Sequence, residues 1–340
     1  MQTLVLDNGL LHVEILPELG GGIARFDWVS GAATLPVFRP RNTDADPSEP
    51  NTLACYPLVP WSNRIGHGRF DFGGATFNAP QTRPDEPYPI HGHGWLSEWE
   101  VLAAETGSIE LYLQHNATDP FCYEAWLRYQ LSGNRLSVTL SVRNLGQPLP
   151  FGLGLHPFLP RTDDVQLQAP AATLWQAGPD CLPTQLTTPT AAWNFDEAHS
   201  LDAEINHAFG GWPGRAEIRW PAQGLQLNIN ADPGYYVLFT PTRQDFFCFE
   251  PVDHPVNAHN LPGGAATNGL TVLATGQTLS RRFHFTVHQT LFSASASSRQ
   301  RGEDSTQEPE CTEVHEDSEY CPTRDHGCAA MLKTAAQEQA

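Results

Sequence analysis

Lysine is almost absent from this chain: of its 19 basic residues, the single lysine is Lys333, close to the C-terminus. Schiff-base aldolases, pyridoxal-phosphate enzymes and Walker-type nucleotide-binding proteins all depend on a lysine amine, for covalent chemistry or for phosphate binding. The rest of the chain has no such amine, so the sequence excludes these classes.

Other features are missing as well. The chain has no apolar run long enough to span a membrane, and its N-terminal segment has neither a basic start nor a continuous apolar stretch. Its seven cysteines include no CxxC pair, so a zinc site built from thiolates is not expected. The net charge of −19 opposes binding to nucleic acid. We therefore expect a cytoplasmic protein that binds neither a membrane nor a nucleic acid.

Short alternating segments, separated by many of the 29 prolines and 28 glycines, predict an all-β fold. Residues 135–144, RLSVTLSVRN, alternate apolar and polar side chains as a half-buried strand does. Residues 216–230 contain two such runs around a Pro-Ala-Gln-Gly turn, which is typical of a hairpin. Helical periodicity is scarce, and residues 201–212 predict at most a turn. These patterns favour a large antiparallel sandwich or barrel.

The composition changes near residue 290. Aromatic residues are frequent before this point, whereas residues 299–340 hold ten acidic and four basic side chains and few bulky apolar ones. Such a segment cannot bury enough apolar surface to offset the entropy lost on ordering. We expect one β-sandwich domain over residues 1–290 and an acidic, disordered tail over residues 291–340.

Two residues are candidates for proton transfer. His156 lies in the apolar, glycine-spaced run FGLGLHPFLPR, and Glu250 ends the apolar run DFFCFE. Burial of a carboxylate raises its pKa toward the range that suits a general base. The structural alternatives are a glutamate ion-paired with Arg243 and a histidine that only fills the core.

Polar residues also cluster in two glycine-rich segments. Asn63 and Arg64 lie in PWSNRIGHGRFDF, and His91 and His93 lie two residues apart in YPIHGHGWLSEW. His91, His93 and Glu98 have the spacing of the first metal-binding motif of cupins, which are β-barrels that bind iron or manganese. The flanking glycines predict a loop, however, instead of the strand that a cupin site needs.

Five segments, taken in order, resemble the aldose 1-epimerase (galactose mutarotase-like) family, and the likeness covers roughly residues 5–288. The segments are CYPLVPWSNRIGHGRFDFGG, IHGHGWLSEW, GLGLHPFLP, INHAFGGWPGRAEI and FCFEPVDHPVNAHN. The resemblance implies a large antiparallel β-supersandwich. It also implies a cofactor-independent, metal-free isomerase that opens and recloses the ring of a hexose.

The resemblance implies roles for individual residues. Glu250 would be the general base and His156 the general acid, placed on opposite sides of the sugar and titrating not far from neutrality. Asn63, Arg64 and His91 would bind sugar hydroxyls. Asn206 stands where family members often have a sugar-binding aspartate, and its amide accepts hydrogen bonds without the charge.

Three alternatives remain open at this point. A mutarotase for hexose 6-phosphates would need additional cations, for which Arg69, Arg83 and Arg161 are candidates. The Asn206 substitution is compatible with a non-catalytic protein that binds or senses a sugar. The third alternative is the cupin-like metalloenzyme.

Overall fold

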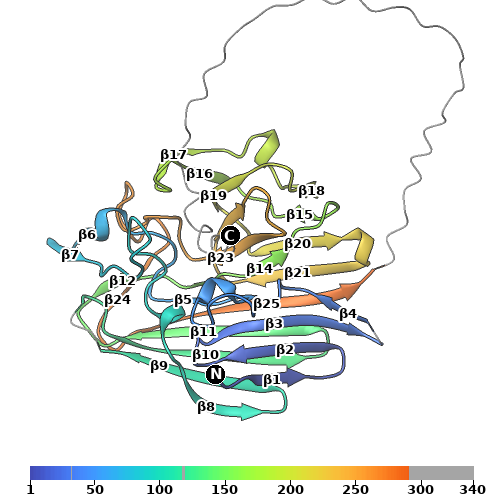
Figure 1. Cartoon of the computed structure of the whole chain (residues 1–340). Coiled ribbons are helices and arrows are strands. Elements are labelled where there is room, and N and C mark those ends of the chain that lie inside the picture. Colours follow the sequence, from blue (N-terminus) through green and yellow to red (C-terminus); the bar gives the residue numbers. More distant parts are fainter. Residues whose placement is uncertain (32, 117–118, 291–340) are drawn as a thin grey trace, which may run out of the picture.

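The computed structural model describes residues 1–31, 33–116 and 119–290, and the expected acidic tail over residues 291–340 lies outside these ranges. The regular structure of the described part is almost entirely β-strand (Figure 1), which confirms the all-β prediction. Its helical segments are short 3-10 turns: η1 (Pro50–Thr52), η2 (Gly66–Gly68), η3 (Gly94–Leu96), η4 (Ala191–Trp193) and η5 (Pro221–Gln223). None of them is long and apolar enough to cross a membrane.

The larger sheet is antiparallel and combines early and late parts of the chain. Its order is β18 (His199–Ser200), β15 (Gln166–Gln168), β20 (Arg215–Trp220), β21 (Leu225–Ala231), β25 (Thr278–Gln289), β11 (Arg135–Asn144), β10 (Tyr123–Ser132), β9 (Ser108–His115) and β8 (Glu100–Glu105). Alternate residues of β11 are buried, as its sequence pattern predicts. The predicted hairpin is also confirmed, because η5 joins β20 to β21.

A second antiparallel sheet contains Glu250, and His156 lies between two of its short strands. Its order is β17 (Pro183–Thr187), β16 (Thr173–Ala177), β19 (Ile205–Gly210), β22 (Tyr235–Thr240), β23 (Phe246–Val252), β13 (Gly154–Leu155) and β5 (Pro57–Leu58), with β14 (Phe158–Pro160) also paired to β23. The expectation of a mere turn over residues 201–212 is wrong, since β19 lies inside this sheet between β16 and β22. Ala208 and Phe209 are both buried, so the strand lacks the alternation by which it could have been recognised.

The remaining strands form smaller sheets. β1 (Leu4–Asp7), β2 (Leu11–Leu16), β3 (Gly22–Ser30) and β4 (Ala33–Pro36) make a four-stranded N-terminal sheet. β6 (Arg69–Phe72) pairs with β7 (Ala75–Asn78), and β12 (Leu149–Phe151) pairs with β24 (Thr271–Leu273).

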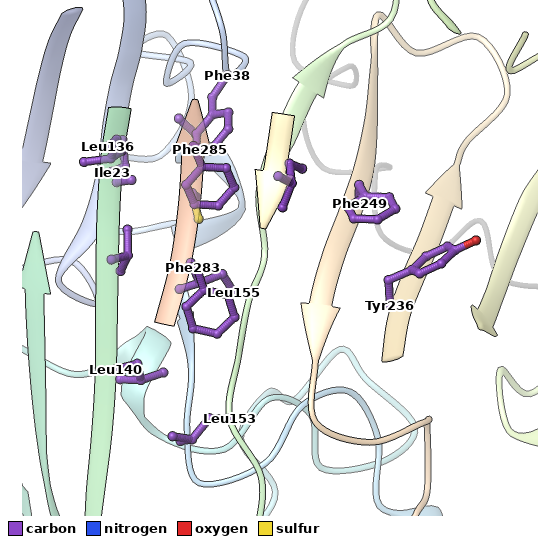
Figure 2. Close-up of a cluster of buried hydrophobic side chains, with 14 of the residues drawn as sticks. Ile23, Phe38, Leu136, Leu140, Leu153, Leu155, Tyr236, Phe249, Phe283 and Phe285 are labelled. Atoms are coloured by element: carbon purple, nitrogen blue, oxygen red, sulfur yellow. The ribbon is translucent and has the colours of Figure 1, made fainter. Parts of the chain in front are cut away.

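The main core joins the two large sheets and the N-terminal sheet (Figure 2). Phe283 and Phe285 project from β25, and Phe249 and Tyr236 belong to the same core from the second sheet. The ring of Phe285 meets that of Phe38 edge-on, with 5.1 Å between centroids. Side chains alternate along β23, so Phe249 enters this core while its neighbours point to the opposite face. That opposite face carries the candidate site.

Candidate active site

Glu250 and His156 are in direct contact on the outer face of the second sheet. Every residue of β23 is buried, and Glu250 is only 2% exposed. Its Oε1 lies 3.3 Å from Nε2 of His156. The structure thus brings the two proton-transfer candidates together, but as neighbours and not on opposite sides of a space for a sugar. A sugar would have to approach both groups from the same side.

His156 is held at a break between two short strands. β13 and β14 both pair with β23, and the pairing is interrupted at His156 and Pro157. The backbone N–H of His156 donates instead to the carbonyl oxygen of Tyr56 at 2.9 Å. Its ring packs between those of Tyr56 and Phe158, with centroids 4.6 Å and 4.7 Å away. Because Pro157 has no N–H to donate to the sheet, the strand pairing stops here, and the side chain of His156 can turn toward Glu250.

The surroundings shift the pKa values of the pair in opposite directions. Burial raises the pKa of Glu250 to about 8, and the charge of Arg64 opposes this rise. Burial lowers the pKa of His156 to about 3. Titration near neutrality is thus expected of Glu250 but not of His156. Between these two pKa values the pair carries one proton, and burial favours its location on Glu250.

Asn63 and His91 exchange two hydrogen bonds between their loops. The backbone N–H of Asn63 donates to Nδ1 of His91, and the backbone N–H of His91 donates to the carbonyl oxygen of Asn63, both at 3.0 Å. Both residues have a positive φ, 53° and 61°, in a region that Asn and His occupy more readily than most residues with a side chain. The reciprocal bonds fix this uncommon geometry.

These bonds also define the state of the His91 ring. Because Nδ1 accepts a hydrogen bond, the proton of the neutral ring lies on Nε2, which is then a donor. Burial lowers the pKa of His91 well below its usual range, so the ring stays neutral. Its centroid lies 5.2 Å from that of His156.

The loop of His91 requires a glycine at the next position. Gly92 has a φ of 67°, and a Cβ there would lie 2.4 Å from the carbonyl oxygen of Val59.

Arg64 links the Asn63–His91 loops to the Glu250–His156 pair. Its Nη1 donates to Oδ1 of Asn63 at 3.3 Å, and its Nε and Nη2 lie 2.9 Å and 2.8 Å from Oε2 of Glu86. Its backbone carbonyl accepts from Asn257 at 2.9 Å, which helps to fix the residue in place. Its charge is close enough to Glu250 to lower the pKa of that carboxyl.

Asn206 lies on the same face of the sheet, but farther from the pair. It pairs across β22 with Phe239, which in turn pairs with Cys248, two residues before Glu250 on β23. Its Nδ2 lies 3.9 Å from Sγ of Cys181. The register therefore puts Asn206 on the site face, two strands away from Glu250.

Two polar atoms of the pair make no hydrogen bond within the described part of the chain. Oε2 of Glu250 and Nδ1 of His156 are both buried. A buried acceptor without a partner is costly, since it has lost its hydration. A ligand hydroxyl that reached Oε2 would supply the missing partner.

Comparison with known proteins gives the family. The family model for aldose 1-epimerase matches residues 2–286. The chain belongs to the aldose 1-epimerase family. It is 29% identical to the uncharacterized Escherichia coli K12 protein YphB over an alignment of 296 positions that covers 82% of this chain and 96% of YphB. It is also 25% identical to the uncharacterized protein YihR of the same organism over an alignment of 275 positions that covers 76% of this chain and 86% of YihR.

Solved structures agree with this membership. The fold matches a crystal structure of an E. coli K12 protein named as a candidate aldose 1-epimerase, with a TM-score of 0.78 and 27% identity over 85% of this chain and 99% of the other. The galactose 1-epimerase of Lactobacillus acidophilus shares the fold, with a TM-score of 0.70 at 17% identity, covering 84% of this chain and 94% of the other. The predicted galactose mutarotase-like β-sandwich is therefore confirmed.

Within this family fold, two of the alternatives from the sequence can be compared with the geometry. Glu250 contacts His156, whereas Arg243 is exposed in a turn. The cupin-like set of His91, His93 and Glu98 is not assembled. Glu98 is exposed, and His93 stacks on His115 beside Asp119.

His93, His115 and Asp119 are close enough to one another to hold a metal ion. The two imidazole rings are only 17° from parallel and 3.8 Å apart. The lone pairs of their nitrogens consequently lie in two nearly parallel planes, which is unfavourable for binding one ion.

The arginines considered for a sugar phosphate are differently placed. Arg83 is ion-paired with Glu49 and Asp85, and Arg161 donates to the carbonyl oxygens of Pro241 and Leu201. Arg69 is exposed on β6. Two of the three arginines thus already have protein acceptors.

Sequence reasoning missed two residues that shape this site. Tyr56 lies inside a segment that resembles the family, yet nothing in its spacing distinguishes it from a core tyrosine. Its ring contacts those of His156 and Trp95. Glu86 lies in the proline-rich segment TRPDEPYP, which reads as a solvated loop. The only sequence signal for Glu86 is its position shortly before the segment of His91.

Proposed function

We propose that this chain is an aldose 1-epimerase that interconverts the α and β anomers of a free hexose by acid/base ring opening and reclosure. The observation that supports this most directly is the contact of 3.3 Å between the buried Glu250 and His156. Two groups in contact that together hold one proton can move a proton between two oxygen atoms of a bound sugar. Membership of the aldose 1-epimerase family supports the same reaction.

The proposed ring opening uses Glu250 as base and His156 as acid. Glu250 takes the proton of the C1 hydroxyl while His156 gives its proton to the ring oxygen. The bond between C1 and the ring oxygen breaks as the C1 carbonyl forms. Ring opening thus starts from the less populated form of the pair, with the proton on His156, and ends with the proton on Glu250, which is the arrangement that burial favours.

Reclosure reverses these transfers after the sugar rotates about its C1–C2 bond. Glu250 returns its proton to the carbonyl oxygen, and His156 takes the proton of the attacking hydroxyl. Attack on the other face of the carbonyl gives the other anomer. The Nε2 proton of His91 and the free donors of Arg64 would hold the sugar hydroxyls, with Asn63 orienting both side chains and Asn206 contacting the far end of the sugar.

Polarimetry tests the proposal. Freshly dissolved α-D-glucose or α-D-galactose is expected to lose its excess optical rotation faster with the protein than without it. E250Q and H156N are each expected to reduce this acceleration at least about 100-fold, the lower end of what general acid/base groups contribute. The exposed Glu98→Gln is the matched control and is expected to keep full activity.

Three outcomes would decide against this function. Acceleration that survives in E250Q and H156N would show that other residues perform the chemistry. Sugar binding without acceleration would favour the sugar-sensing alternative. Activity confined to hexose 6-phosphates would identify a different substrate.

A further inference from the structure

Glu86 is a buried carboxylate at the edge of the site that none of the family-like segments contains. Its Oε2 accepts a hydrogen bond from Nε of Arg64 at 2.9 Å and lies 2.8 Å from Nη2. The side chains of Arg64 and Glu86 are 10% and 6% exposed. At such burial the two charges are weakly screened by water, so each depends strongly on the other.

The loop that carries Glu86 is itself fixed. The side-chain amide of Gln81 donates to the carbonyl oxygen of Glu86 at 2.6 Å. Thr82 exchanges hydrogen bonds with the backbone of Ile90, the residue that bridges to Arg64. These hydrogen bonds fix the loop, so the Glu86 carboxylate is held against the Arg64 guanidinium.

The contacts with Glu86 and Asn63 use only part of the hydrogen-bonding capacity of Arg64. A guanidinium has five N–H donors. One on Nε and one on Nη2 face Glu86, and one on Nη1 faces Oδ1 of Asn63. Among the contacts of the described residues, two donors remain, and they belong to a group whose positive charge is offset by its neighbour. Such a group suits hydroxyl oxygens better than a phosphate.

We propose that Glu86 is a positioning and specificity residue: it holds Arg64 beside the Glu250–His156 pair and offsets its charge, so that the site accepts an uncharged aldose in preference to a phosphorylated one. This inference rests on the proposed mutarotase function and adds the residue that makes the site disfavour a phosphorylated sugar. Arg64 and Glu86 act together as a neutral unit with two directed hydrogen-bond donors.

The same unit affects the proton of the catalytic pair. Four groups in contact with or electrostatically linked to Glu250 are neutral near pH 7. Burial lowers the pKa of His156 and raises the pKa values of Tyr56, Cys55 and Cys248 still further above neutrality. Arg64 is the charged one, and it lowers the pKa of Glu250. Removing the negative charge of Glu86 would leave this cation unopposed. The pKa of Glu250 would then fall further.

The test uses the full chain, Glu86→Gln and the control Asp85→Asn. Asp85 neighbours Glu86 on the same loop but pairs with Arg83, and its side chain is 52% exposed. Infrared spectroscopy follows the protonated carboxyl band that disappears in E250Q, and its pH titration gives the midpoint for Glu250. Polarimetry gives KM and kcat for glucose, with inorganic phosphate as a competing anion.

In E86Q the titration midpoint is expected to fall by about one pH unit. KM for glucose is expected to rise at least about fivefold, and phosphate is expected to inhibit at least about fivefold more strongly than in the wild type. D85N is expected to match the wild type in all three respects. A purely structural role for Glu86 would lower activity without moving the midpoint or the phosphate inhibition.

A folded E86Q with an unmoved midpoint and unchanged phosphate inhibition would overturn the inference. If E86Q does not fold, Glu86→Asp replaces it, since it keeps the charge but withdraws it from Arg64 by one methylene. It is expected to shift the midpoint in the same direction by a smaller amount, and no shift would again overturn the inference. A wild type without mutarotase activity would refute the proposed function, whereas the infrared titration would still test the link from Glu86 to Glu250.

Discussion

The two faces of strand β23 are both buried, yet they differ in almost every other respect. On the inner face, Phe249 stacks on Tyr236 with 4.6 Å between ring centroids, inside the main core. On the outer face the next residue, Glu250, contacts His156 and keeps one carboxylate oxygen without a hydrogen-bond partner among the residues that the structure describes. Phe249 thus lies in a packed apolar core, whereas the adjacent Glu250 lies in a polar environment that leaves one of its hydrogen-bond acceptors unsatisfied.

If the proposed function holds, this difference separates stability from chemistry within one strand. The two-residue period of a strand sends neighbouring side chains to opposite faces, so one strand can anchor the core and present a reactive group. The inner face ties β23 rigidly to the rest of the sandwich. The outer face can then hold an unsatisfied carboxylate, a destabilising feature, without losing its geometry.

The largest expected effect on stability comes from the inner face. Phe249→Ala removes a fully buried ring and is expected to lower the free energy of unfolding by about 3–5 kcal/mol. Urea denaturation measures this loss, and polarimetry at low temperature measures the activity of the molecules that remain folded. That activity is expected to stay within about threefold of the wild type. A fully folded F249A without activity would refute the separation of the two faces.

The outer face is expected to affect stability in a pH-dependent way. The pKa of Glu250 rises from its ordinary value of 4.5 to about 8 in the folded protein, so folding favours the protonated form. This contribution is fully present below pH 4.5 and is lost as the pH rises toward 8. E250Q cannot ionise at this position and should escape the loss.

We therefore expect E250Q to gain thermal stability relative to the wild type as the pH rises from 5 to 9, while its activity is lost. Differential scanning calorimetry at these two pH values measures the effect, with Glu98→Gln as the exposed control. A difference in melting temperature between wild type and E250Q that does not change with pH would show that Glu250 is already ionised in the fold.

The smallest expected effect is at Asn206, on the site face but two strands from the pair. Asn206→Asp restores the residue that family members often have, and a charged acceptor binds a hydroxyl more strongly than an amide does. We expect kcat/KM for a free hexose to rise about fivefold, mainly through a lower KM. An unchanged KM for both glucose and galactose would place Asn206 outside the sugar site.

Local patterns in the sequence predict much of this molecule. Alternation revealed β11 and the hairpin of β20 and β21, because each has one face in the core and one toward solvent. The same rule failed for β19, which is covered on both faces and has no alternation to detect. For the site, the residues could be named from segments that resemble the family, yet their contacts could not.

The contact between Glu250 and His156 depends on how β13, β14 and β23 pair, and the sequence does not encode this locally. The low pKa of His156 has the same origin, because burial is a property of the assembled sheet. Glu86 was missed for a further reason. Nothing in a proline-rich loop indicates that one of its carboxylates turns inward to Arg64.

The hydrogen bonds between Asn63 and His91, together with the contact between His156 and Glu250, have a consequence for folding. They join four separate stretches of the chain, and each bond requires its partner stretch to have docked already. Contacts between distant parts of a chain form late and slowly during folding. Catalytic activity should therefore return in the last phase of refolding, after the inner core has closed, so that no partly assembled form of the molecule can turn over a sugar.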